Sequence, residues 1–173
     1  MPPAIEIRAF TQADSKAVRD LFITVNRQLA PDHLKQAFED YIALSLNEEI
    51  DCIRDYYGAK HGGFWVANAA DRLVGMFGLE ATSTNAMELR RMYVEPTARR
   101  QGIARSMLQF AESECQRLRR SRMILSTSEL QSGALSLYRT SGYKLDREEA
   151  AGAANNRTVG GGIRRFHFSK DLL

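Results

Sequence analysis

The sequence is poor in the residues that build disulfide frameworks and metal sites. Its 173 residues include only two cysteines, Cys52 and Cys115, and three histidines, His33, His61 and His167. None of the five stands at a metal-ligand spacing from another. Both cysteines fall in stretches that we expect to be helical, which is typical of packed, reduced thiols. The sequence therefore predicts neither a disulfide framework nor a metal cofactor.

Long apolar runs are also missing. No segment approaches the roughly 18 to 20 apolar residues that cross a bilayer, and the N-terminal MPPAIEIRAF lacks the apolar core of a secretory signal. We expect a soluble, cytoplasmic protein with no membrane partner. The composition, 44% apolar and 26% charged, is that of an ordinary globular protein, and no repeat or linker divides the chain. We therefore expect a single domain over residues 1–173.

The net charge of +3 is small but unevenly distributed. Between residues 32 and 55, seven acidic residues stand against two basic ones, so this stretch is −5 and the rest of the chain is +8. Such an asymmetry favours a basic site for an anionic cofactor beside an acidic surface for a cationic substrate. Two solvated helix faces would produce the same pattern, so both interpretations stay open.

Hydrophobic periodicity indicates a mixture of strands and helices. Strands are predicted at 5–9, 64–68, 73–80, 86–94, 123–127, 143–147 and 163–170, and helices at 18–29, 32–57, 103–118 and 132–141. The hairpin spacing predicts an α/β (α+β) domain with a mixed, mainly antiparallel sheet of six or seven strands and about four helices. The connection 150–162 is expected to be mobile, and Gly160-Gly161-Gly162 within it is a hairpin turn or a gate.

The segment VEPTARRQGIA, from Val94 to Ala104, places a strand end, a turn and a helix start in sequence. The first turn of a helix has unpaired N–H groups and a partial positive charge, so it can bind a pyrophosphate. Small residues at Gly102 and Ala104 leave room, while Arg99 and Arg100 add positive charge. The spacing fits neither a P-loop nor a Rossmann fingerprint.

Two further motifs flank this turn: ELxxxYVxP starts at Glu88, and QxxAxxLYxxxGY starts at Gln131. Together the three motifs resemble the GNAT superfamily of acetyl-CoA-dependent N-acetyltransferases, most clearly over residues 64–143. The stretch TSxxQxxA from Thr127 looks more similar to the camello-like branch of this superfamily than to its ribosomal-protein branch. The resemblance implies the GNAT fold, in which two central strands splay apart and acetyl-CoA lies between them.

The resemblance also implies a set of cofactor-binding residues. These are Met92, Tyr93, Val94, Arg99, Arg100, Gln101, Gly102, Ile103, Ala104, Gln131 and Tyr138. The backbone of Met92 and Val94 would contact the pantetheine and acetyl end, and the N–H of Met92 would stabilise the oxyanion. The turn from Arg99 to Ala104 would bind the pyrophosphate. Gln131 stands where many members have an asparagine.

Acetyl transfer to an amine needs a neutral nucleophile, a stabilised oxyanion and a proton for the leaving thiolate. Deprotonating a lysine-like amine costs roughly 4 to 5 kcal/mol at pH 7, so a base or a water relay helps. Glu88 matches a position where several GNAT members carry a glutamate base, although a structural pair with Arg90 is the alternative. Glu80 is the reserve base, acting through water. Tyr138 would be the general acid, or otherwise a core aromatic.

We therefore expect an acyltransferase that moves acetyl from acetyl-CoA directly to a primary amine. The acceptor would be a polyamine-like or amino-acid-like small molecule or a protein amine, and the acidic stretch favours a cationic one. One alternative is a catalytically degenerate coenzyme A-binding sensor or partner-binding module. Another is a nucleic-acid adaptor using the arginines of residues 117–122, but these lack interleaved aromatics, so no nucleic-acid partner is expected. A monomer and a homodimer are both compatible with the sequence.

Overall fold

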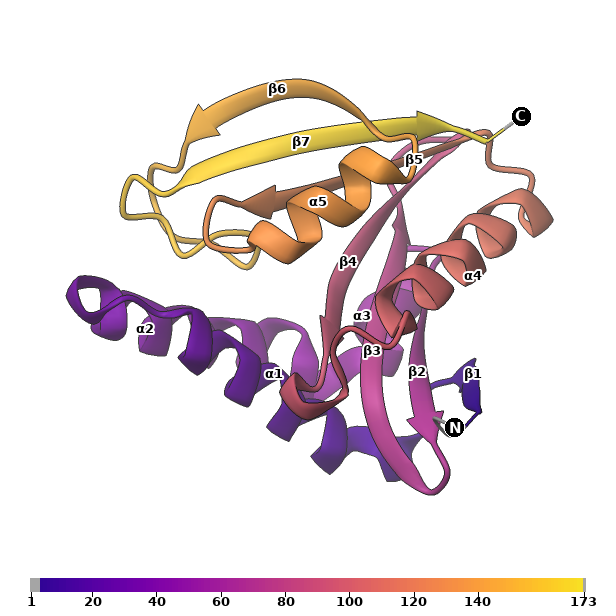
Figure 1. The fold of residues 1–173 in the computed structure, drawn as a ribbon, viewed down its shortest axis with the longest axis horizontal. Coiled ribbons are helices and arrows are strands. Elements are labelled where there is room, and N and C mark those ends of the chain that lie inside the picture. The colour runs from indigo at the N-terminus through magenta and orange to yellow at the C-terminus, as the bar shows by residue number, and fades with distance from the viewer. Residues whose placement is uncertain (1–3, 173) are drawn as a thin grey trace.

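A single seven-stranded sheet forms the centre of the computed structural model, which describes residues 4–172 (Figure 1). The strands are β1 (Ile5–Ala9), β2 (Gly63–Ala69), β3 (Arg72–Ala81), β4 (Ala86–Val94), β5 (Arg122–Ser128), β6 (Lys144–Ala150) and β7 (Arg164–Asp171). Their spatial order is β1-β2-β3-β4-β5-β7-β6. Neighbours are antiparallel except for β4 and β5, which are parallel. The predicted fold class, a mixed and mainly antiparallel sheet, is confirmed.

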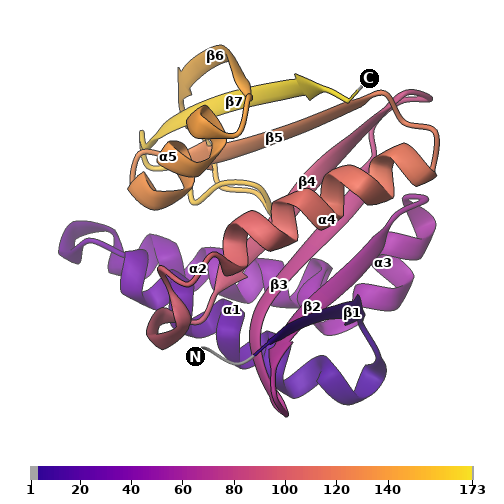
Figure 2. The same ribbon diagram turned by 45° about the vertical axis from the view of Figure 1, so that its right-hand side comes forward.

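Helices cover both faces of the sheet (Figure 2). They are α1 (Ser15–Leu29), α2 (Lys35–Glu48), α3 (Ile53–Ala59), α4 (Ile103–Arg117) and α5 (Ser132–Thr140), with short 3-10 turns between several elements. The core on one face is built from α4 and α5, and the core on the other from α1, α2 and α3. None of the helices within residues 4–172 has the length and apolarity needed to span a membrane.

The α4 helix shows how local pattern produces this arrangement. Ile103, Met107, Ala111 and Cys115 recur at helical spacing and are all buried against the sheet. Cys115 and Cys52 are both free thiols, as expected. Full burial of one apolar stripe stabilises the helix by roughly 1.5 to 3 kcal/mol for each large side chain.

The second helical region differs from the sequence prediction. Instead of one helix over 32–57, the chain forms α2 and α3, separated by a 3-10 turn at Ile50–Cys52. The break occurs at Glu49, whose φ and ψ of −140° and −59° are not helical and whose side chain is completely buried. The chain leaves the helix where this carboxylate meets arginines of β4, a contact that helical periodicity cannot reveal.

Candidate active site

The two parallel strands at the centre of the sheet pair over only part of their length. The β4–β5 ladder runs from Ala86↔Arg122 to Leu89↔Leu125 and stops there. Beyond it, β4 continues to pair with β3, and β5 continues to pair with β7. The strands therefore diverge, and an open cleft with an empty volume of about 550 Å³ lies between their C-terminal halves.

A β-bulge in β4 begins where the strands separate. Met76 of β3 faces Tyr93 and Gly78 faces Arg90, so two residues, Arg91 and Met92, oppose the single residue between them on β3. Arg91 takes a left-handed conformation with φ of 56°, which a bulky side chain adopts only when its surroundings hold it there. The bulge ends regular pairing and redirects the backbone of β4.

The side chain of Arg91 is held by a buried carboxylate. Its Nε donates to Glu49 Oε2 at 2.9 Å, its Nη2 donates to Glu49 Oε1 at 3.0 Å, and its Nη1 donates to the Tyr41 hydroxyl. Glu49 also accepts a hydrogen bond from the Tyr57 hydroxyl at 2.6 Å. Burial opposes ionisation of Glu49, but the charges and hydrogen bonds of Arg91 and Arg90 outweigh it and lower the pKa of the carboxyl.

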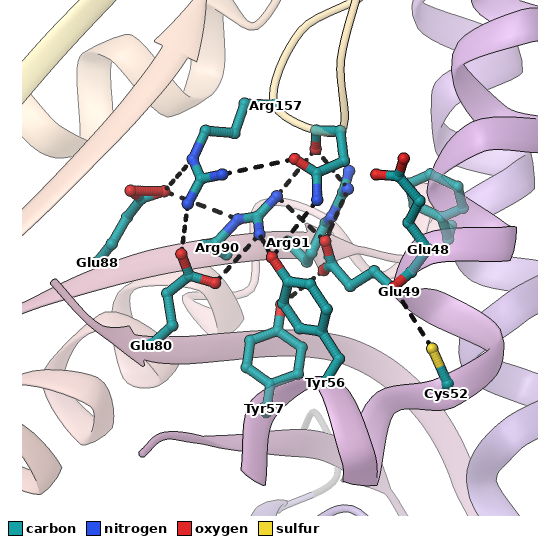
Figure 3. A network of polar contacts seen from close by, with 12 residues as sticks. Glu48, Glu49, Cys52, Tyr56, Tyr57, Glu80, Glu88, Arg90, Arg91 and Arg157 are labelled. Carbon is teal, nitrogen blue, oxygen red and sulfur yellow. Dashed lines mark hydrogen bonds and ion pairs between the residues drawn. The ribbon is translucent and has the colours of Figure 1, made fainter. Parts of the chain in front are cut away.

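A second group of ion pairs joins this one at Arg90 (Figure 3). The Arg90 guanidinium lies 3.1 Å from Glu49 and 3.2 Å from Glu80, and Arg157 contacts both Glu80 and Glu88. We call Glu49, Glu80, Glu88, Arg90, Arg91 and Arg157 the charge network. Desolvation alone would lower the pKa of the Arg90 guanidinium, but the neighbouring Glu49 raises it.

The connection between β6 and β7 contributes directly to the charge network. The backbone oxygen of Asn156 accepts hydrogen bonds from Arg90 at 2.9 Å and from Arg91 at 2.7 Å. Arg157 is the next residue, and its side chain forms ion pairs with Glu80 and Glu88 of the sheet. The sequence suggested a mobile segment over 150–162; in the structure its middle is tied to the strands by polar contacts that residue composition does not reveal.

The two candidate bases occupy different positions in this arrangement. Glu88 lines the cleft, with Oε1 at 3.2 Å from Arg157 Nε and 3.7 Å from Arg90 Nε. Glu80 is buried between Arg90 and Arg157 and does not line the cleft. The ion pair between Glu88 and Arg90, the alternative to a catalytic role, is thus present. Of the two candidate bases, Glu88 is the one that a substrate in the cleft could reach.

Tyr138 combines a packed ring with a position at the cleft. Its ring centroid lies 5.8 Å from that of Tyr143 and 6.1 Å from that of Phe168. Within residues 4–172, its hydroxyl makes no hydrogen bond, and the residue lines the cleft. Burial, reinforced by Tyr93, raises the pKa of the Tyr138 hydroxyl, which therefore keeps its proton at neutral pH.

Gln131 and β4 supply polar groups around the same cleft. Gln131 Oε1 accepts a hydrogen bond from Thr127 Oγ1 at 3.1 Å, which leaves the amide nitrogen available on a residue that lines the cleft. Met92 and Tyr93 also line it, whereas Val94 does not. The Tyr93 ring packs on Phe22 of α1, with centroids 6.0 Å apart.

The glycine turn lies outside the cleft lining, between the end of β4 and the start of α4. Gly102 and Arg100 both have left-handed conformations, with φ of 78° and 63°. A Cβ on Gly102 would meet no atom within 4 Å, so the conformation and not lack of space calls for glycine. Gln101 lies between them, and Ile103 and Ala104 form the first turn of α4, where backbone N–H groups have no helical partner.

The comparisons with known proteins agree with this geometry. Residues 60–145 match the family model described as an acetyltransferase (GNAT) domain. N-acetyltransferase 8 of Homo sapiens is 31% identical over 120 residues, which cover 64% of this chain and 51% of that one. N-acetyltransferase family 8 member 3 of Rattus norvegicus is 32% identical over 120 residues, with the same coverage. The chain belongs to the GNAT superfamily.

Solved N-acetyltransferase structures share the fold over nearly the whole chain. An N-acetyltransferase from Staphylococcus aureus Mu50 has a TM-score of 0.74 at 15% identity, covering 98% of this chain and 99% of that one. The PaiA N-acetyltransferase from Thermoplasma acidophilum, in complex with coenzyme A, has a TM-score of 0.73 at 21% identity, covering 97% and 99%. The chain spans about half the length of the curated relatives it matches.

The GNAT motifs did not point to two arginines that the structure places at the cleft. Arg157 comes from the β6–β7 connection, and Arg165 comes from β7. Arg157 carries no sequence signal that we can identify. Arg165 carries a sequence signal. Successive side chains of a strand point to opposite faces, and Phe166 and Phe168 of β7 pack into the core, so Arg165 lies on the other face.

Proposed function

We propose that the protein is an acetyl-CoA-dependent N-acetyltransferase that moves acetyl directly to a primary amine. The observation that supports this most is the opening of β4 from β5 beyond Leu89. Two strand edges with unpaired N–H and C=O groups need polar partners, and the amide-bearing pantetheine arm of acetyl-CoA can lie between them as an extended chain. The turn from Arg99 to Ala104 would bind the pyrophosphate through the N-terminus of α4.

The proposed chemistry uses groups on both sides of the cleft. The neutral amine attacks the thioester carbon, and the N–H of Met92 stabilises the oxyanion that forms. In the resulting intermediate the attacking nitrogen is positively charged. Glu88 accepts a proton from this nitrogen, either directly or through a water molecule, and Glu80 is the reserve base. The C–S bond then breaks, and Tyr138 donates its proton to the coenzyme A thiolate. Gln131 would contact the cofactor through its free amide nitrogen. No metal takes part in this scheme.

The structure removes part of the argument for a polycationic acceptor. Four of the seven acidic residues between 32 and 55 form ion pairs within the chain, namely Asp32 with Lys35, Glu39 with Arg27, Glu49 with Arg91 and Asp51 with Arg19. Their charge is therefore partly neutralised before any substrate arrives. We further propose that residues 1–173 form a single domain and that the protein is cytoplasmic and either a monomer or a homodimer.

The test starts with the thermal midpoint of the purified protein with and without acetyl-CoA. A ligand at about a hundred times its Kd adds roughly 2.7 kcal/mol of stability. We expect this shift in the wild type and its loss in Gly102→Glu, where a carboxylate would repel the pyrophosphate. Gly58→Glu, at an exposed glycine of α3, is the matched control and should keep the shift.

An amine panel with release of free thiol as the readout then tests turnover. Turnover with any amine supports the proposal. A thermal shift with no turnover on any amine would favour the sensor or partner-binding module. Absence of the shift together with salt-dependent binding of DNA or RNA would replace the proposal with the nucleic-acid adaptor.

A further inference from the structure

Arg165 is a partly buried arginine at the cleft that lacks a counter-ion. Its Nη2 donates a hydrogen bond to Ser126 Oγ at 2.7 Å. None of the carboxylates within residues 4–172 approaches its guanidinium to ion-pair distance. Burial lowers the pKa of the Arg165 guanidinium, in contrast to the raised pKa values of Arg90 and Arg91. A desolvated charge without a counter-ion is costly, and an anionic ligand would offset that cost.

The carboxylates around this arginine already have other partners. The charge network joins three carboxylates to three arginines, Arg90, Arg91 and Arg157. On the other side, Glu149 of β6 lies 2.8 Å from His167 and 2.9 Å from Arg147. Arg165 is therefore an additional positive charge, and the cleft lining holds four arginines but only one carboxylate, that of Glu88.

A second cavity extends from Arg165 toward α1 and α2. It has an empty volume of about 370 Å³ and shares Tyr41, Tyr93, Gln131 and Arg165 with the cleft. Apolar side chains contribute much of its wall: Leu29, Phe38, Val159 and Ile163. Arg165 is the one charged residue in its lining. The cavity thus places apolar side chains next to a positive charge.

We propose that Arg165 binds a carboxylate of the acceptor, and that the acceptor is an amino carboxylic acid with an apolar side chain. This inference rests on the proposed acetyltransferase function. The acceptor amine lies toward Glu88 in the cleft, its carboxylate meets Arg165, and its apolar side chain enters the second cavity. A guanidinium suits this role because its planar donors match the two oxygens of a carboxylate.

The test compares acceptors that differ only at the carboxylate. Leucine, methionine and phenylalanine are each assayed beside their carboxamides, with spermidine as a polycationic acceptor, and thiol release gives kcat/KM. The wild type should prefer each acid over its amide by about 10- to 100-fold, the range expected for hydrogen bonds between charged groups. The lower pKa of an α-amino amide works against this preference, so the assay does not favour the expected result.

Variants assign the preference to one side chain. Arg165→Gln, which retains a donor for Ser126, should bring the acid-to-amide ratio close to one, and Arg165→Lys should give an intermediate ratio. Arg164→Gln is the matched control: Arg164 is the preceding residue and pairs with Glu148 at 3.3 Å on the exposed side, so its ratio should equal that of the wild type. The acetyl-CoA thermal shift verifies that each variant is folded, and Arg165→Lys decides if Arg165→Gln does not fold.

The outcomes separate the two proposals. If spermidine or the amides react and the acids do not, or if both Arg165 variants keep the wild-type ratio, the carboxylate assignment is overturned while the acetyltransferase function stands. If acetyl-CoA produces no thermal shift and no amine is acetylated, the acetyltransferase function itself fails and the assignment fails with it.

Discussion

Replacing Glu49 with glutamine should destabilise the protein more than any single change at the surface. Glu49 is completely buried and contacts Arg91 twice, at 2.9 and 3.0 Å, and Arg90 at 3.1 Å. Glutamine keeps the shape but removes the charge, so two buried guanidinium groups lose a counter-ion. Breaking a buried pair in this way costs about 3 to 5 kcal/mol. For a chain of this size, the melting temperature should fall by roughly 6 to 20 °C.

The pH dependence of the unfolding free energy tests the same prediction in a second way. Because the folded protein lowers the pKa of Glu49, its contribution is fully present above the carboxyl's ordinary pKa and is lost as the pH falls through the lower, folded value. The difference in unfolding free energy between wild type and Glu49→Gln should therefore be constant near pH 7 and shrink below about pH 4.3.

Urea denaturation at a series of pH values measures this difference. The control is Glu39→Gln, which removes an exposed pair with Arg27 and should leave the midpoint nearly unchanged. If Glu49→Gln matched this control at pH 7, the buried pair would contribute nothing to stability and the argument for the charge network would be wrong.

Three further changes address the cleft and the glycine turn. Tyr138→Phe should lower kcat by on the order of 100-fold or more, with the acetyl-CoA Kd unchanged in a direct titration, because only the proton donor is lost; wild-type turnover would remove Tyr138 from the mechanism. Gly102→Ala places a side chain at a φ of 78°, so it should cost about 1 to 2 kcal/mol in urea denaturation and weaken acetyl-CoA binding; unchanged stability would show that the turn relaxes. Glu88→Gln should lower kcat/KM more at pH 7 than at pH 9, where more acceptor is already neutral, and an equal loss at both pH values would argue against a base.

Local elements followed from the sequence where neighbours in the chain determine them. The stripe from Ile103 to Cys115 predicted α4, and the alternating residues of β1 predicted that strand. The β6–β7 connection was interpreted less well. Its Ala, Asn and Gly content suggested mobility, yet Asn156 accepts hydrogen bonds from arginines more than 60 residues earlier in the chain. Amino-acid composition indicates how flexible a segment would be without tertiary contacts, whereas this segment is held by hydrogen bonds with β4.

The sequence alone determined the family and the position of the glycine turn. Three motifs in order identified a GNAT chain, and a left-handed residue at Gly102 is a local requirement that a single glycine satisfies. Only the tertiary structure decided which charges neutralise one another. Glu49 and Arg91 are separated by 42 positions, and the sequence around neither residue indicates that they form a pair. Coulomb interaction depends on distance in space and on exclusion of water, so pairing, and with it the unpaired Arg165, emerges only when the sheet and the helices are assembled.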